Sequence, residues 1–242
     1  MSDLRTAFES IVQFRRSNRA FDPATEVPED VIQQALEQAM LSPNSSNMQL
    51  WEFHWIQSPE LKQQFISLCL DQSAAKTAKH LIVFVTRQDL WKKRAKWNLE
   101  KVQSTISGEL TPQQKGGLQY YKLLMPFLYV RDVLGIMGIV RKAISFLMGL
   151  RKPFFRAGGA AFQRIVVHKS CALAAQTFML SIASAGFHTC PMEGFDENRV
   201  KNILRLPGKA EINMIIAVGK GTEKGIWGPR FRVPKDEIII NH

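Results

Sequence analysis

The most informative stretch of this 242-residue chain is Arg15-Arg16-Ser17-Asn18-Arg19-Ala20-Phe21. It places three guanidinium groups and one hydroxyl within five residues, directly after an amphipathic segment that predicts a helix over residues 3–14. A guanidinium donates two parallel hydrogen bonds to a single anion, so a cluster of this kind suits a phosphate group. The alternative is that the arginines only solvate the carbonyl end of the helix, which attracts cations. The cluster alone leaves both interpretations open.

Length and composition are those of a globular protein with a sizeable core. The chain is 45% hydrophobic and 22% charged, which fits one domain or a closely fused pair. Its net charge of +11 raises the question of nucleic acid or anionic lipid as a partner. Because lysine and arginine are spread along the chain without a nucleic-acid motif, we expect no specific nucleic acid partner.

The cysteines and the first residues indicate the compartment. Cys69, Cys171 and Cys190 are odd in number and form no CxxC pair, which argues against a disulfide framework or a zinc site. We therefore expect no metal. Asp3 and Glu9 lie where a signal peptide would need an apolar run, so none is predicted. The expected location is cytoplasmic.

Hydrophobic periodicity predicts helices that alternate with strands. Helices are predicted from Pro28 to about Met40, at 59–69, 89–103 and 162–185, and after an N-cap at Asp196; strands are predicted at 50–56, 81–86 and 212–218. This alternation indicates an α/β or α+β layered domain. A short apolar strand at 238–240 is expected to pair with a sheet edge, in its own subunit or in a partner.

Three later segments could form further walls of the site at the arginine cluster. Residues 42–47 collect hydroxyl and amide groups, although a plain turn is the alternative. Gly194 permits close approach of the backbone to a ligand. Arg230 and Arg232 point to the same side of an extended chain and could hold one anion. His168 is interpreted as packed or capping, because no acidic residue lies three or four positions away.

The stretch 113–152 departs from the alternating pattern. It is heavily apolar from Tyr120 to Leu150, but charged residues interrupt it, so that no uninterrupted run of about twenty apolar residues could span a membrane. A substrate lid, a dimer-contact hairpin and an amphipathic membrane anchor are the alternatives. We expect a helical insertion or lid at about residues 104–160. Lid or dimer contact is favoured over peripheral membrane contact through residues 120–152.

Taken together, these stretches resemble the nitroreductase family of FMN-dependent NAD(P)H oxidoreductases. The resemblance rests on Arg15–Phe21 with Asp22, on SPNSSNMQLW at 42–51, on PMEGFD at 191–196 and on the tail Arg230–Pro234. It covers the chain except about residues 100–160. It implies one domain over residues 1–242 with an α+β fold, in which helices flank a central mixed or antiparallel sheet. It also implies an intertwined homodimer with C-terminal strand exchange and two FMN sites at the subunit interface.

The resemblance assigns cofactor-binding residues to both ends of FMN. Those at the phosphate and ribityl end are Arg15, Arg16, Ser17, Asn18, Arg19, Arg230 and Arg232, with Arg19 also near the N1/O2 edge of the ring. Those at the ring system are Pro43, Asn44, Ser45 and Asn47 from the other subunit, Gln72 near the pyrimidine edge, Pro191 and Met192 against the ring, and Glu193 and Gly194 as backbone donors to N5.

The implied activity is ping-pong hydride transfer through flavin N5, from NADH or NADPH to a nitroaromatic, a quinone or a similar small-molecule acceptor. No side chain is expected to be catalytic, because the cofactor carries the chemistry and Arg19 and the Glu193/Gly194 backbone tune it. One alternative is a flavin-dependent dehalogenase-like relative. Another is a basic module without turnover that binds membrane surfaces or nucleic acid, which predicts no chromophore and salt-sensitive binding.

Overall fold

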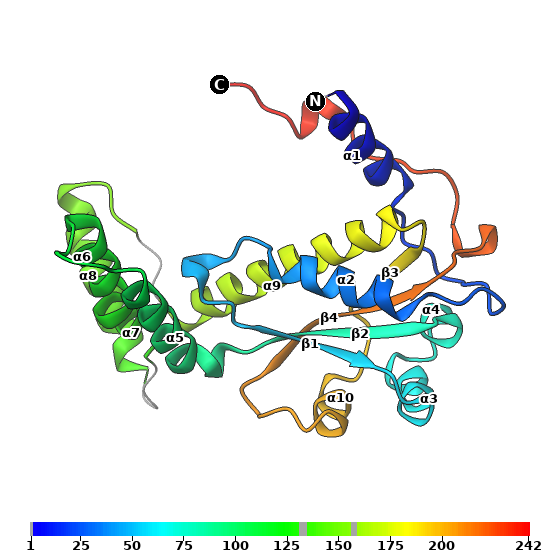
Figure 1. Cartoon of the computed structure of the whole chain (residues 1–242), viewed down its shortest axis with the longest axis horizontal. Helices are drawn as coiled ribbons and strands as arrows, with labels where there is room; N and C mark the ends of the chain where they lie inside the picture. The colour runs from blue at the N-terminus through cyan, green and yellow to red at the C-terminus, as the bar shows by residue number, and fades with distance from the viewer. Residues whose placement is uncertain (1, 131–134, 156–158) are drawn as a thin grey trace.

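The protein has an α+β fold built on a four-stranded antiparallel sheet with the order β1-β2-β4-β3 (Figure 1). A computed structural model describes residues 2–130, 135–155 and 159–242. The strands are β1 (Trp51–Ile56), β2 (His80–Thr86), β3 (His188–Met192) and β4 (Glu211–Gly219). The predicted α+β class is therefore confirmed.

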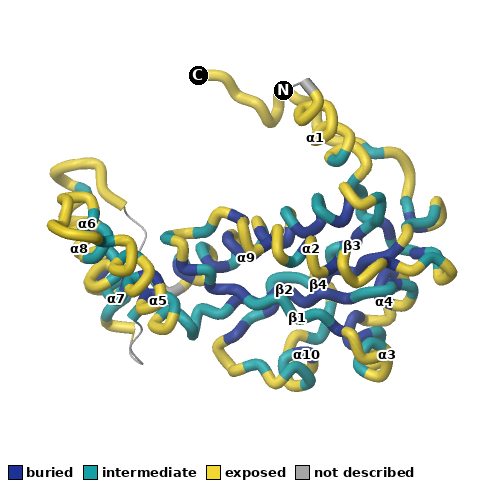
Figure 2. The backbone as a smooth tube through the Cα atoms, viewed as in Figure 1, coloured by how far each residue is buried: buried dark blue, intermediate teal, exposed yellow. Residues whose placement is uncertain are grey.

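Helices cover both faces of this sheet. The described helices are α1 (Ser2–Phe14), α2 (Glu29–Met40), α3 (Pro59–Leu68), α4 (Ser73–Thr77), α5 (Trp91–Ser104), α6 (Pro112–Gln119), α7 (Met125–Tyr129), α8 (Ile136–Arg151), α9 (Ala160–Ser184) and α10 (Glu197–Ile203). One core cluster joins α2 and α9 to Ile82, Phe84 and Ile216, and the other joins α3, α4 and α10 to Leu81 and Val83. This alternation follows from the two-residue period of a strand, and Figure 2 shows the core as the dark central layer.

The apolar sequence of α9 reflects its central position. By length and composition alone α9 could cross a membrane. In the structure its Cys171, Ala174 and Phe178 are buried against α2 and the sheet. Its hydropathy is therefore that of a core helix.

Two parts of the sheet differ from the sequence pattern. The strand β3 was not predicted, because Pro191 interrupts it; proline is tolerated there since β3 is an edge strand. The expected strand at 238–240 does not form in this chain, where Ile238 and Ile240 are exposed in irregular backbone after a 3-10 turn. Pairing of this segment with a partner's sheet edge stays a prediction.

The insertion between α5 and α9 is helical in its described part. It contains α6, a π-helical turn at Tyr120–Leu124, α7 and α8, and these helices lie with α5 beyond one end of the sheet (Figure 1). Met125 and Tyr129 anchor it through a third core cluster that includes Met48 and Leu50. Its expected role as a lid stays a prediction.

Two half-buried histidines make stability depend on pH. Trp55 Nε1 donates to His80 Nδ1 at 3.2 Å, and the Gly221 amide donates to His188 Nδ1 at 3.1 Å, so both rings accept as neutral imidazoles. Burial lowers the pKa of His80 and of His188, with Lys220 adding to the effect on His188. Unfolded histidine takes up a proton near pH 6.5, so the unfolded chain binds more protons than the folded chain below that pH. We expect the free energy of unfolding to fall as the pH falls from about 7 towards the lowered folded-state pKa values.

Urea unfolding between pH 5 and pH 8 measures this dependence. The variant His80→Gln should flatten it, while His242→Gln, at an exposed residue, should leave it unchanged. A wild-type unfolding free energy that stays level or rises on acidification through pH 6.5 would contradict the assignment.

Candidate functional site

A cavity of about 210 Å³ lies where the arginine cluster meets the C-terminal tail. The residues that line it come from opposite ends of the chain: Arg15, Arg16, Ser17, Arg19, Trp227, Pro229, Arg230, Phe231 and Arg232. The fold thus brings the two predicted arginine groups to one place. No acidic side chain is among these lining residues, so the cavity has the electrostatic character of an anion site.

The loop that carries the cluster is held by backbone bonds to β3 and to the segment after β4. The Asn18 amide nitrogen donates to Thr189 O at 3.0 Å, and the Arg19 amide nitrogen donates to Gly225 O at 2.9 Å. The Asn18 side chain is 1% exposed, and its Nδ2 donates to Thr222 O at 2.9 Å. Asn18 was predicted to bind cofactor, but its side chain is used inside the loop because the buried amide must satisfy its own hydrogen bonds.

Arg230 joins the tail to the end of α1. Its guanidinium donates to Gln13 O at 2.9 Å and to Arg15 O at 2.7 Å. Capping of the α1 carbonyl end, the alternative considered for the arginine cluster, is therefore supplied by Arg230 from the other end of the sequence. Arg16 makes a further contact with the tail, since its Nη2 donates to Gly228 O at 2.9 Å.

The cavity concentrates positive charge. Burial lowers the pKa of Arg15, and the neighbouring guanidinium groups of Arg230 and Arg232 lower it further. These like charges repel one another, so an anion between them would relieve the repulsion. Arg19 lies 4.2 Å above the ring of Trp227, which orients it by a cation–π contact. A phosphate monoester fits this donor set.

A second group of predicted residues lies at the far end of β3. Gln72, the N-cap residue of α4, donates from Nε2 to Gly194 O at 2.6 Å. Thr189, beside the arginine loop, precedes Gly194 by five residues, which corresponds to roughly 15 Å of extended chain. An elongated ligand could therefore touch both groups. Glu193 and Gly194 are exposed.

Met192 has a different environment from the one predicted. It was expected to pack against the flavin ring, but it is 2% exposed and lies in the core cluster with α3 and α10. The period of β3 explains this, since Met192 and Cys190 point into the core while Pro191 points to the other face and is half-buried.

The residues of the loop at 42–47 lie at the other end of the sheet. Strand register places Trp51, which follows this loop, beside Thr86, whereas Thr189 near the arginine loop lies beside Val218. Figure 1 shows the two regions on opposite sides of the sheet. One chain therefore does not bring the following four predicted residues to the arginine cavity: Pro43, Asn44, Ser45 and Asn47.

Local contacts fix this loop firmly. Asn47 Nδ2 donates to Asn98 Oδ1 at 3.1 Å, and Asn98 Nδ2 donates back to Asn47 O at 2.9 Å. Tyr121 from the insertion donates to Ser46 O at 3.0 Å. A small apolar cavity of about 150 Å³ opens beside the loop, and its lining includes Ser45 and Phe155 together with Leu128, Tyr129, Phe162 and Val166.

Sequence reasoning missed two features of the site. Trp227 was not selected, although an exposed tryptophan beside Gly228 in a basic tail is itself a signal. The tyrosines that hold the loop at 42–47 were not found, because they are more than seventy residues away.

In the described residues no group of histidine, cysteine and acidic side chains could hold a metal ion. Burial raises the pKa of the Cys69 thiol to about 11, so this thiol is protonated at neutral pH.

Comparison with known proteins gives one consistent result. The family model described as "Nitroreductase family" matches residues 12–220. "Protein DrgA" of Synechocystis sp. is 27% identical over 216 residues, which cover 89% of this chain and 84% of that protein. "Putative NAD(P)H nitroreductase MhqN" of Bacillus subtilis is 27% identical over 186 residues, which cover 77% and 89%. A solved structure from Exiguobacterium sibiricum, described as "a putative nitroreductase in complex with FMN", superposes with a TM-score of 0.68 at 23% identity over 97% of both chains.

Proposed function

The chain belongs to the nitroreductase family and is an FMN-dependent oxidoreductase that uses NAD(P)H, and we propose that it reduces a nitroaromatic, a quinone or a similar acceptor in a ping-pong sequence. The observation that carries this proposal is the arginine-lined cavity in which both ends of the chain meet. When bound, FMN supplies the redox chemistry by accepting hydride from the nicotinamide at N5 and returning it to the acceptor. We propose a cytoplasmic location, where this donor is available.

The arginines of the cavity are proposed to bind the FMN phosphate. Arg15, Arg16 and Arg232 line the cavity. Burial first, and then the charges of Arg230 and Arg232, lower the pKa of Arg15, and a bound dianion would offset this repulsion. Arg230 positions the tail through its bonds to α1, and Asn18 positions the loop. Arg19, fixed over Trp227, is proposed to direct its charge toward the N1/O2 edge of the ring.

The end of β3 is proposed to hold the ring. The backbone at Glu193 and Gly194 is exposed, and Gln72 fixes the Gly194 carbonyl, so the amide groups of this turn have a defined direction. A methyl group on Gly194 would lie 3.3 Å from Gln72 Nε2, so glycine keeps this contact uncrowded. Met192 supports the turn from the core, and Pro191 is the residue of this pair that could contact the ring.

A homodimer is proposed to complete each site. The loop at 42–47 and the arginine cavity lie at opposite ends of one sheet, so a two-fold arrangement can bring the loop of one copy to the cavity of the other. Exposed apolar residues on α1 and on the tail, among them Phe8 and Ile240, would be buried from water by contact with a second chain. Figure 1 shows both segments extending from the same side of the body, as exchanged elements would.

Mixed dimers test this composite site. A chain with Arg15→Ala and Arg19→Ala lacks two cations of the arginine cavity, and a chain with Ser45→Trp carries a bulky side chain in the loop at 42–47. Each homodimer should therefore lose both FMN sites. Co-expression in equal amounts makes half of the dimers mixed, each with one intact site, and about one quarter of wild-type FMN content and turnover should return. A mixture no more active than its two components would place the whole site within one chain.

The acceptor is proposed to bind beside the loop at 42–47. The apolar cavity there is lined by aromatic side chains of the insertion and of α9, including Phe155 and Phe162, which suits a planar acceptor that stacks. The helical insertion is proposed to act as its lid.

The visible absorption spectrum of the purified protein tests the proposed function. We expect an oxidised flavin spectrum that bleaches when NADH or NADPH is added without oxygen and returns when menadione or a nitroaromatic is added. A colourless protein that ignores added FMN would overturn the assignment. A flavin that bleaches but returns with none of these acceptors would overturn only the choice of acceptor.

A further inference from the structure

The helix α8 has its polar and apolar faces reversed. Arg141 and Ser145 are 3% and 7% exposed, and Arg141 donates to the carbonyls of Phe127 and Val130, each at 2.9 Å. The opposite face is apolar and open to solvent, with Ile139 and Leu150 exposed by 67% and 64%. A surface helix of a globular protein normally turns its apolar face inward. This face therefore needs a separate explanation.

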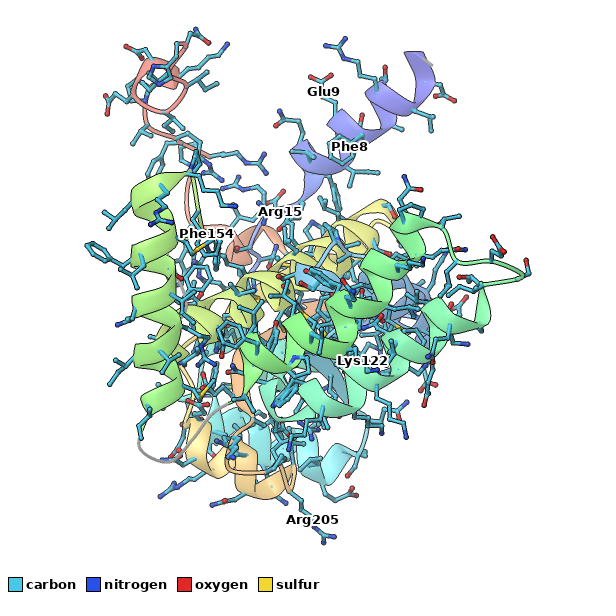
Figure 3. All side chains as sticks on the ribbon, turned by 90° about the vertical axis from the view of Figure 1, so that its left-hand side faces the viewer. Phe8, Glu9, Arg15, Lys122, Phe154 and Arg205 are labelled. Carbon is cyan, nitrogen blue, oxygen red and sulfur yellow. The ribbon has the colours of Figure 1, made fainter. Side chains whose placement is uncertain are left out.

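The apolar face is continuous along the helix. Its exposed residues recur at helical spacings and include Ile139, Val140, Ile144, Phe146, Leu147 and Leu150. Phe154, exposed by 40%, extends it past the end of α8. Figure 3 shows α8 as the light green helix at the edge of the molecule, with side chains pointing away from the body and Phe154 near its upper end. We call the exposed apolar residues of α8 together with Phe154 the α8 face.

Basic residues accompany the α8 face. The sequence from 110 to 192 contains ten lysines and arginines and a single acidic residue, which lies outside the described part. Lys142 and Arg151 are exposed and nine residues apart, about two and a half helical turns, so they lie on opposite sides of the helix. They flank the apolar stripe, and Lys152 continues the basic character next to Arg151.

We propose that the α8 face binds the surface of a lipid bilayer that contains anionic lipids. Apolar side chains would enter the boundary between headgroups and acyl chains, and the flanking cations would contact the headgroups. At 16 residues α8 is about 24 Å long, too short to cross a hydrocarbon core of about 30 Å, so it lies along the surface.

A second copy of the chain fits this face less well. A two-fold contact between two α8 helices would bring the cations Lys142 and Arg151 of one copy close to those of the other copy. The described part of this segment has no acidic side chain that could compensate their repulsion. A nucleic acid would use the cations but would leave the apolar stripe exposed to water. An anionic bilayer satisfies both the charge and the apolar surface.

Vesicle co-sedimentation of the intact holoprotein tests the proposal. We expect binding to phosphatidylcholine vesicles that contain 30% phosphatidylglycerol, and at least about tenfold weaker binding to phosphatidylcholine alone. Ile139→Glu with Leu147→Glu should weaken binding to the anionic vesicles about tenfold or more, since two exposed apolar side chains are lost from the interface. Lys142→Glu with Arg151→Glu should do the same by charge.

Matched variants control for general effects. Leu41→Glu alters an exposed leucine just past the end of α2, and Arg205→Glu alters an exposed arginine that Figure 3 shows at the lower edge of the molecule, away from Phe154; both should bind like wild type. Failure of the wild type to bind either vesicle overturns the proposal. If the wild type does not bind vesicles and Ile139→Glu changes the oligomeric mass, a second copy of the chain covers the α8 face, which also overturns the proposal. Circular dichroism and FMN content keep folding defects apart from both outcomes.

Discussion

Replacing Arg230 with alanine should weaken FMN binding about ten- to a hundredfold. The guanidinium group lines the arginine cavity and donates to carbonyls at the end of α1, so one substitution removes a cation from the anion site and releases the tail. Hydrogen bonds of charged groups contribute about 1.5–3 kcal/mol each, and 1.4 kcal/mol corresponds to a factor of ten in affinity. Titration of apoprotein with FMN, followed by fluorescence quenching, measures the loss.

The control for this variant is Arg205→Ala, which removes an exposed arginine far from the cavity in sequence and should leave FMN affinity unchanged. The parallel variant Arg19→Ala should also lower retention, because Arg19 shares the cavity. Both variants should keep wild-type circular dichroism. If both single variants, Arg19→Ala and Arg230→Ala, keep full FMN content, the arginine cavity is not the phosphate site.

The variant Gly225→Ala should lower the free energy of unfolding by about 2–3 kcal/mol, which is a typical cost of forcing extra atoms into a filled space. It should also abolish FMN retention. A methyl group at this position would lie 1.8 Å from Asn18 Oδ1 and 2.6 Å from the Ala20 amide nitrogen. Neither atom can move freely, because Asn18 is buried and hydrogen-bonded on both sides. The arginine loop must then leave its present position.

Gly208→Ala is the matched control for this substitution. A methyl group at Gly208 meets no atom within 4 Å, so unfolding by urea and FMN content should both stay near wild type. An unfolding midpoint of Gly225→Ala equal to that of Gly208→Ala would show that the loop is not held as described.

The sequence allowed the phosphate end of the site to be predicted because its chemistry is local. Three arginines within five residues and two more at alternate positions of the tail can be recognised without a fold. Most predicted helices and the strands β1, β2 and β4 were also found, because each carries a continuous hydrophobic pattern. The strand β3 was missed because a proline in an edge strand resembles a turn.

What was not predicted depends on contacts between distant residues. His168 was interpreted as packed or capping because no acidic residue lies three or four positions away, yet its Nε2 lies 2.8 Å from Glu211 Oε2, forty-three residues away on β4. The inward position of Met192 depends on the register in which β3 pairs with β4. The inward position of Arg141 depends on the carbonyl groups near the end of α7 that accept its hydrogen bonds. Periodicity identifies the faces of an element, but tertiary packing decides which face becomes the inner one.

The separation of the loop at 42–47 from the arginine cavity links cofactor loading to assembly. If each copy holds only part of a site, FMN binds the dimer more tightly than the single chain, and by thermodynamic reciprocity FMN tightens the dimer by the same factor. The measured affinity for FMN would then rise with protein concentration. A shortage of FMN would then also weaken the dimer, and a shortage of protein would also weaken FMN binding, so the number of working enzymes would depend on both concentrations together.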